Sequence, residues 1–299
     1  MGTRLALFGL GSMGHGMALS CLRAGLTVHG VDVEPERAAR FVAEGGAEGE
    51  VHDIAPELDA GVLVVLNAAQ VEAVLFGGDG IVPRLRPGAV VMACATVAPH
   101  FAKAMEARCA EHGVLYLDAP ISGGAAKAAM GALGIMASGT SAAFEAAAPV
   151  LDATAETVFR LGDAAGAGSA MKAVNQLLAG VHIAAMAEAL TFGMTQGIAP
   201  ATFLDVISKC AGTSWMLENR APHIVAGDYT PLSQVNIWPK DLGIVLEAAQ
   251  AAGFHAPITE AALARYAEAV EMGLGGADDA AVAKVYARDA GLVLPDAET

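Results

Sequence analysis

GAGSAMKAVNQLLAGVHIAAMAEALTFGMTQG, residues 166–197, is a proline-free stretch dominated by strong helix formers. Its apolar side chains fall on nearly every side of a helix, which is typical of a helix buried inside a protein. At a rise of about 1.5 Å per residue, residues 169–196 would span roughly 40 Å, enough to pass from one domain into another. We therefore expect one long helix shared between two domains.

Two polar residues near the start of this helix, Lys172 and Asn175, are three positions apart. That spacing puts them on one helix face, about one turn apart. A lysine in so apolar a helix is unusual, because buried lysines are rare without a partner. The helix alone leaves two interpretations open: Lys172 reaches solvent from the first turn, or it is held in the interior for a chemical purpose.

The chain on the N-terminal side of this helix alternates short apolar runs with helix-compatible segments. The expected strands cover residues 4–8, 26–31, 61–66, 89–94 and 114–118, with 134–138 and 157–161 as possible further strands. Repeated strand-then-helix units predict a parallel sheet covered by helices on both faces.

The chain beyond residue 162 is almost wholly helical in pattern. Further helices are expected over residues 200–210, 215–220, 239–252, 258–272 and 278–288. The predicted fold is therefore an α/β, doubly wound (Rossmann) domain over residues 1–162. An all-α domain for substrate binding and oligomerisation follows over residues 163–299.

The first strand is followed by GLGSMG, in which Gly9, Gly11 and Gly14 form a G-x-G-x-x-G pattern that leads into a helix. Gly9 permits a tight turn, Gly11 lets the backbone approach a pyrophosphate, and Gly14 lets the helix pack closely on the strand. The N–H groups at the helix start can bind phosphates. The pattern alone is a weak signal, but its position between strand and helix predicts a dinucleotide site. The residues expected to line the turn are Gly9, Leu10, Gly11, Ser12, Met13 and Gly14.

Asp32 ends the second expected strand, about 20 residues beyond the glycines. An acidic residue there accepts hydrogen bonds from the adenine ribose and repels a 2′-phosphate, so it favours NAD over NADP. No arginine follows directly, since the next residues are Val33 and Glu34. Alternatively, Asp32 caps the helix that begins near Pro35. The two roles are compatible.

Three further polar residues follow expected strands: Asn67, Thr96 and Ser122. Ligands of doubly wound sheets bind beyond the carboxyl ends of the strands. We therefore expect these three residues to line one crevice. Ser122 begins a Ser-Gly-Gly run with Gly123 and Gly124, whose backbone N–H groups could hold an anion; a plain turn is the alternative.

The composition narrows the class of protein. Hydrophobic residues make up 55% of the chain and charged residues 16%, which argues against disorder. A net charge of −15 argues against nucleic acid as a partner. No stretch has the continuous lipophilicity expected of a membrane span, and glycines break the apolar N-terminus, so no membrane partner and a cytoplasmic location are expected. The scattered cysteines favour buried free thiols over a metal site.

Four local sequences occur together in order: GLGSMGHGM (9–17), DAPISGG (118–124), GAGSAMKAVNQ (166–176) and KDLGIVLEAA (240–249). This combination resembles the β-hydroxyacid dehydrogenase family, which includes 3-hydroxyisobutyrate dehydrogenase and tartronate semialdehyde reductase. The resemblance covers nearly the whole chain. LNAAQVEAVLFG (66–77) together with KDLGIVL looks most like the L-threonate dehydrogenase branch. One departure is Ala93-Cys94-Ala95 before Thr96, where the family more often has Asp or Ser; we interpret it as packing variation.

The resemblance implies roles for the residues. NAD would be held by the glycine turn, Asp32, Asn67, Ala68, Thr96 and Lys240. Ser122, Gly123 and Gly124 would bind the carboxylate of a small hydroxy acid. Lys172 would be the catalytic residue and Asn175 a substrate ligand, with no metal required.

The chemistry of the residues agrees with these implied roles. Oxidation of an alcohol needs a group that takes the hydroxyl proton as hydride leaves, and a lysine held largely dry can do so. The resemblance to the L-threonate dehydrogenase branch implies that the reaction is NAD-dependent oxidation of L-threonate to its 2-oxo acid. Alternatives are 3-hydroxyisobutyrate dehydrogenase, tartronate semialdehyde reductase, and a non-catalytic NAD-binding module, against which the presence of Lys172, Asn175 and Lys240 counts. The apolar C-terminal half favours a homodimer or homotetramer.

Overall fold

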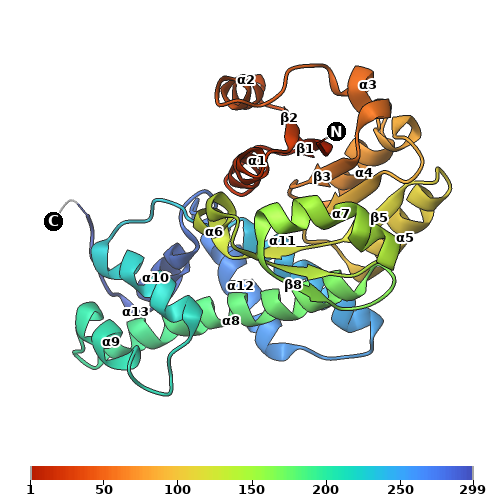
Figure 1. Cartoon of the computed structure of the whole chain (residues 1–299). Coiled ribbons are helices and arrows are strands. Elements are labelled where there is room, and N and C mark those ends of the chain that lie inside the picture. The colour runs from red at the N-terminus through yellow and green to blue at the C-terminus, as the bar shows by residue number, and fades with distance from the viewer. Residues whose placement is uncertain (1, 298–299) are drawn as a thin grey trace. The chain divides into compact units, whose positions relative to one another are not determined.

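A computed structural model describes residues 2–297 of the 299-residue chain. Contacts divide the chain into two compact units, Met1–Lys172 and Ala173–Thr299. The division falls inside α8, an uninterrupted helix over Ala167–Thr195 (Figure 1). The domain boundary expected from the sequence, between residues 162 and 163, lies earlier in the chain and stays a prediction.

The first unit is built on a five-stranded parallel sheet in the order β2-β1-β3-β4-β5. Its strands are β1 (Arg4–Phe8), β2 (Thr27–Val31), β3 (Ala60–Leu63), β4 (Val90–Ala93) and β5 (Leu115–Asp118). All five fall where apolar runs predict strands, which confirms the α/β fold class. Because β2 and β3 flank β1 on opposite sides, the chain reverses direction across the sheet at the carboxyl end of β1. This is the position where doubly wound sheets bind ligands.

Helices cover both faces of this sheet, as the sequence predicts. Alternate residues of β1 separate into two cores. Leu5 and Leu7 pack with α1 (Gly14–Arg23) and α7 (Ser141–Thr154), whereas Ala6 and Phe8 pack with α4 (Ala68–Phe76) and α5 (Pro99–Ala110). This two-residue period follows from the pleat of a strand buried on both faces. The unit also contains α2 (Pro35–Ala43), α3 (Val51–Ile54) and α6 (Gly124–Met130), with 3₁₀ turns η1 (Ala55–Glu57) and η2 (Val82–Arg84).

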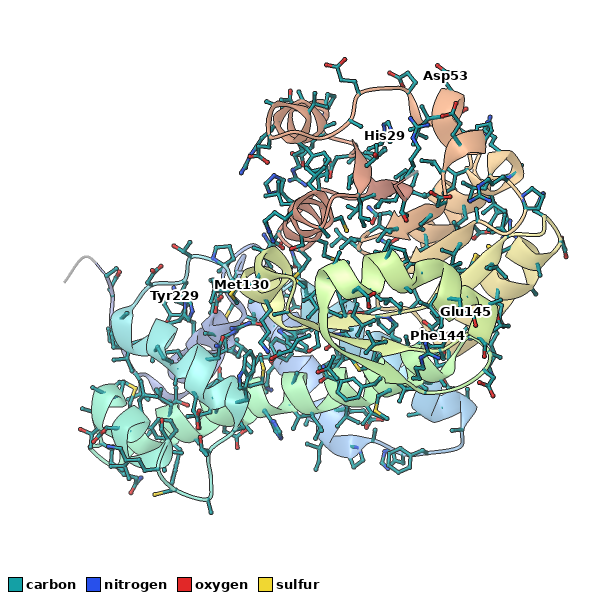
Figure 2. All side chains as sticks on the ribbon, in the orientation of Figure 1. His29, Asp53, Met130, Phe144, Glu145 and Tyr229 are labelled. Carbon is teal, nitrogen blue, oxygen red and sulfur yellow. The ribbon has the colours of Figure 1, made fainter. Side chains whose placement is uncertain are left out.

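The last part of this unit differs from the expected continuation of the parallel sheet. A separate three-stranded sheet contains β6 (Ile121–Ser122), β7 (Leu133–Ala137) and β8 (Ala155–Arg160), and β6 runs antiparallel to β7. The two possible strands near residues 134 and 157 are therefore real but belong to a second sheet. Figure 2 labels Phe144 and Glu145 on α7, which connects β7 to β8. Phe144 is buried against the core, whereas Glu145 is exposed.

The second unit is helical, as predicted. Apart from an isolated bridge between Gln234 and Asp278, its described residues form helices and loops. Its helices are the remainder of α8, then α9 (Pro200–Ile207), α10 (Trp215–Ala226), α11 (Ile237–Ala251), α12 (Pro257–Glu271), η3 (Asp279–Val282) and α13 (Ala283–Ala290). Helix α10 continues through Pro222 beyond its expected end at Arg220, because Arg220 and Ile224 are both buried in this unit. Tertiary packing overrides the local effect of the proline.

Helix α8 corrects one expectation. An 18-residue window within it has a mean hydropathy of 1.5, so its length and composition do meet those of a membrane span. In this window 44% of the residues are buried. Ile183, Ala187 and Leu190 belong to the hydrophobic core of the second unit. This packing supports the interpretation of α8 as a core helix of a globular fold.

Candidate active site

The turn between β1 and α1 has the geometry that its glycines predict. Gly9 adopts a φ of +96°, and a Cβ added there would lie 2.4 Å from the carbonyl oxygen of Val64. A Cβ added at Gly14 would lie 1.8 Å from the carbonyl oxygen of Gly9. By contrast, the nearest atom to a Cβ at Gly11 is 3.9 Å away, on Arg37. Gly9 and Gly14 therefore close the turn, while Gly11 leaves space in front of it.

Asp32 ties this turn to the end of β2. Its Oδ2 atom accepts a hydrogen bond from the N–H of Leu10 at 2.6 Å, and its Oδ1 atom accepts one from the N–H of Glu34 at 2.9 Å. The side chain is 5% exposed. Asp32 does not cap α2, because the N-cap position is Glu34. The alternative interpretation of Asp32 as a helix cap is therefore wrong, although it does bind a backbone N–H just before the helix.

Arg37 is a neighbour of Asp32 that the sequence reading missed. Its guanidinium lies 3.7 Å from Asp32 Oδ2 and 2.9 Å from Glu34 Oε1. The absence of an arginine directly after Asp32 is therefore weaker evidence for NAD over NADP than the sequence alone indicates. Arg37 lies in the first turn of α2, three positions after Glu34 and five after Asp32. At the start of a helix, side chains with these separations can meet. Reading one helical turn further would have found it.

Other predicted cofactor residues follow the neighbouring strands β3 and β4. Asn67 is the N-cap of α4, where its side-chain oxygen accepts a hydrogen bond from the N–H of Gln70 at 2.9 Å. Ala68 is the first residue of that helix. Thr96 comes shortly after β4 and is half-buried. The strand order places these segments along the same edge of the sheet as the glycine turn.

Lys172 is buried, with 8% of its surface exposed. Its Nζ atom donates a hydrogen bond to the backbone carbonyl of Ile121 at 2.9 Å. The alternative in which Lys172 reaches solvent from the first turn of α8 is therefore wrong. The contact brings the amine to the residue that directly precedes the Ser122-Gly123-Gly124 run.

The Ser122-Gly123-Gly124 run connects β6 to α6. Ser122 ends β6, and Gly123 and Gly124 adopt φ values of +135° and +77°, which other residues rarely adopt. A Cβ at Gly124 would meet no atom within 4 Å. Two consecutive backbone units in unusual conformations, beside open space and a buried amine, are suited to binding a small anion.

The second unit brings together another polar group. Asn175 Nδ2 donates to Gln176 Oε1 at 2.9 Å, and Gln176 Nε2 donates to Asp241 Oδ2. Asp241 Oδ1 forms an ion pair of 2.6 Å with Lys240 Nζ. The predicted residues Asn175 and Lys240 are thus linked through Gln176 and Asp241. The sequence reading assigned no role to Gln176, although it directly follows Asn175 in a quoted motif.

The four cysteines are free thiols. Cys21, Cys94 and Cys109 are buried, as expected, whereas Cys210 is exposed, contrary to that expectation. Burial raises the pKa of the Cys21 and Cys109 thiols to about 12, so these are poor nucleophiles. Within residues 2–297, no three His, Cys, Asp or Glu side chains gather as a metal site would require.

Two protein-family models match the chain. Residues 4–162 match the NAD-binding domain of 6-phosphogluconate dehydrogenase, and residues 166–286 match a model described as NAD-binding of NADP-dependent 3-hydroxyisobutyrate dehydrogenase. The chain is 49% identical over 287 residues to an L-threonate dehydrogenase of Cupriavidus necator, covering 96% of this chain and 97% of that protein. It is 46% identical over 294 residues to an L-threonate dehydrogenase of Pectobacterium atrosepticum, covering 98% and 96%.

A solved structure gives a similar result. The crystal structure of a 3-hydroxyisobutyrate dehydrogenase from Salmonella typhimurium matches with a TM-score of 0.89 and 47% identity. The match covers 95% of this chain and 99% of that one. Proteins with two different substrate names are therefore about equally similar to this chain over almost its full length.

Proposed function

We propose that this chain, which belongs to the 3-hydroxyisobutyrate dehydrogenase family of NAD-dependent dehydrogenases, oxidises L-threonate at the hydroxyl-bearing carbon next to the carboxylate. The product is the corresponding 2-oxo acid. One observation carries the proposed mechanism: the Lys172 amine is buried and hydrogen-bonded to Ile121, directly before the Ser122-Gly123-Gly124 run.

The glycine turn fits the cofactor. The space at Gly11 and the buried carboxylate of Asp32 are what a pyrophosphate and an adenine ribose require. We assign NAD binding to residues of the turn and of the neighbouring strand ends, together with one lysine of the second unit. These are Gly9, Leu10, Gly11, Ser12, Met13, Gly14, Asp32, Asn67, Ala68, Thr96 and Lys240. NAD, when bound, supplies the hydride acceptor.

The substrate carboxylate is held by the Ser122 hydroxyl and by the N–H groups of Gly123 and Gly124. A local anion site of this kind is needed, because the net charge of −15 repels an anionic substrate at long range. Lys172 takes the proton of the substrate hydroxyl as the C–H bond breaks and the carbonyl forms. Asn175 hydrogen-bonds the substrate and fixes its orientation.

The choice of L-threonate as the substrate rests on sequence identity to named relatives. Curated relatives that are 45–49% identical carry that name, whereas a 3-hydroxyisobutyrate dehydrogenase of Pseudomonas aeruginosa is 35% identical. The Salmonella typhimurium structure keeps 3-hydroxyisobutyrate as the second candidate. The third candidate, a non-catalytic NAD-binding module, is disfavoured by the buried amine of Lys172.

A panel of hydroxy acids tests the substrate. Purified protein, NAD and each acid in turn are followed by NADH absorbance. We expect kcat/KM for L-threonate to exceed that for 3-hydroxyisobutyrate by about 10²-fold or more, because a site that hydrogen-bonds substrate hydroxyls rejects an acid lacking them. Turnover of 3-hydroxyisobutyrate without turnover of L-threonate would make the second candidate correct. Binding of NAD without turnover of any acid would favour the non-catalytic alternative.

The pair of Asp32 and Arg37 predicts how cofactor preference can be changed. Asp32→Asn removes the charge that repels a 2′-phosphate and frees Arg37 from one of its two carboxylates. We expect the ratio of kcat/KM with NADP to that with NAD to rise by about 10- to 100-fold. Adding Arg37→Gln to this variant should cancel most of the gain. An unchanged ratio in Asp32→Asn would contradict the assignment of Asp32.

Oligomerisation is a further part of the proposal. Met171, Val174 and Leu178 are 44%, 56% and 49% exposed, and their spacing puts them on one face of α8. A second copy of the chain covering this face would form a homodimer or, with further contacts, a homotetramer. Light scattering that gives the mass of one 30.1 kDa chain would rule this out. We assign the enzyme to the cytoplasm, in agreement with its unpaired cysteines.

A further inference from the structure

Asp118, the last residue of β5, is a buried carboxylate that receives several hydrogen bonds; it is 1% exposed. Its Oδ2 atom accepts hydrogen bonds from the backbone N–H groups of Gly166 and Ser169, at 2.9 and 2.8 Å. Its Oδ1 atom accepts one from the hydroxyl of Ser169 at 2.7 Å. The hydroxyl of Ser138 donates to Oδ2 at 3.3 Å and itself accepts from the N–H of Gly168 at 2.9 Å.

These contacts bind the start of α8 from outside the helix. The first N–H groups of a helix have no partner within it, and a negative charge at this end is favourable. Asp118 and Ser138 satisfy the N–H groups of Gly166, Gly168 and Ser169. A Cβ added at Gly168 would lie 2.4 Å from the carbonyl oxygen of Met136, so the first turn rests directly on backbone. The start of α8 therefore has little freedom to shift.

Lys172 lies one helical turn beyond Ser169. Its side chain ends on the carbonyl of Ile121, only three residues after Asp118. The backbone of the lysine and its amine are thus both fixed to one short segment, residues 118–121. That segment leads directly into Ser122, Gly123 and Gly124, which hold the substrate carboxylate in the proposed function.

We propose that Asp118 is a positioning residue, which sets the distance between the Lys172 amine and the carboxylate-binding run by fixing the first turn of α8. The inference rests on the proposed role of Lys172 as the general base. Asp118 itself contacts neither the substrate nor the cofactor in this scheme. Misplacement of a reacting group by about 1 Å can lower a rate by about 10²-fold.

The hydrogen bonds, more than the charge, carry this role. Burial raises the pKa of Asp118, while the bonds from Ser169 and Gly166 oppose that rise. An asparagine at this position can keep the arrangement, because its oxygen can accept from the two N–H groups and its amide nitrogen can donate to the Ser169 hydroxyl. The conservative variant therefore separates positioning from a need for negative charge.

Kinetics of three variants test the proposal. For Asp118→Ala we expect kcat to fall about 10²-fold while the Kd for NAD stays within about threefold. Asp118→Asn should retain kcat within about tenfold of the wild type, and Ser169→Ala, which removes one bond, should lie between them. The control is Asp59→Ala: Asp59 accepts the N–H of Arg4 at 2.8 Å, at the amino end of β1. Its loss should lower stability and leave kcat unchanged.

Hydrogen exchange gives a readout that does not depend on turnover. In Asp118→Ala the amides of residues 166–169 should exchange at least about tenfold faster than in the wild type, and in Asp118→Asn they should remain protected. Absence of wild-type turnover would defeat the proposed function, and the exchange data would still test the fixed first turn. Unchanged exchange in Asp118→Ala, unchanged kcat in folded Asp118→Ala, or an Asp118→Asn variant as impaired as Asp118→Ala would each overturn the inference. If Asp118→Ala does not fold, Ser169→Ala with unchanged kcat and exchange would overturn it.

Discussion

Replacing Lys172 by methionine is expected to lower kcat for hydroxy-acid oxidation by about 10²- to 10⁴-fold, the range typical of a lost general base. Methionine keeps an unbranched apolar chain of similar length, so the buried stem is preserved and only the amine is lost. The Kd for NAD should stay within about threefold, because the proposed cofactor contacts lie in the glycine turn and at the strand ends. Steady-state kinetics and a fluorescence titration with NAD measure the two quantities.

A surface lysine provides the control for Lys172. Lys209 is 72% exposed and pairs with Asp205 on α9, outside the proposed site. Lys209→Met should leave kcat within about twofold of the wild type. The pH profile of kcat/KM gives a second test, because the limb that reports the general base should disappear in Lys172→Met. A Lys172→Met variant that keeps more than about a tenth of wild-type kcat would show that another group takes the proton.

Replacing Gly14 by alanine is expected to lower the free energy of unfolding by about 3 kcal/mol or more. The added Cβ would lie 1.8 Å from the carbonyl oxygen of Gly9, a backbone atom that a rotamer change cannot move aside. Either α1 separates from β1 or the turn opens, and both changes disrupt the region proposed to bind the pyrophosphate. Denaturant unfolding measures the loss, and the NAD titration should show binding weakened by at least about 10²-fold.

Gly78 offers a matched control for Gly14. It lies in the same unit, its φ is outside the left-handed region, and an added Cβ would meet no atom within 4 Å. Gly78→Ala should therefore leave both stability and NAD binding close to the wild type. If Gly14→Ala were as stable as Gly78→Ala, the close contact between α1 and Gly9 would not be a requirement of this fold.

Most of the fold could be predicted from the sequence because its signals are local. Each strand of the parallel sheet is a short apolar run followed by a turn, and burial on both faces makes these runs conspicuous. The second sheet is harder to recognise from sequence, because β6 has only two residues and α6 separates it in the chain from its partner strand β7. The end of α10 was placed too early, because Pro222 is a local signal whereas the burial of Ile224 depends on the completed fold.

The candidate site was predictable where a motif lies within one stretch, and not where its partners are distant in sequence. The glycine turn and Asp32 follow from spacing. The hydrogen bond from Lys172 to Ile121 joins residues 51 positions apart, and no local pattern indicates it. The same holds for the bond between Gln176 and Asp241, which connects two helices. Arg37 is an intermediate case, because it lies only one helical turn beyond Glu34.

The hydrogen bonds that fix the first turn of α8 to Asp118 also determine where this chain tolerates changes in length. A residue inserted between Ser169 and Lys172 would rotate the amine by about 100° around the helix axis while the first turn stayed bound to Asp118. The lysine would then face away from Ile121, although every side chain of the site was still present. An insertion beside Gly78 would only enlarge a loop. Natural or engineered variants that differ in length between Ser169 and Lys172 should therefore be regarded as altered enzymes even when all motifs are present.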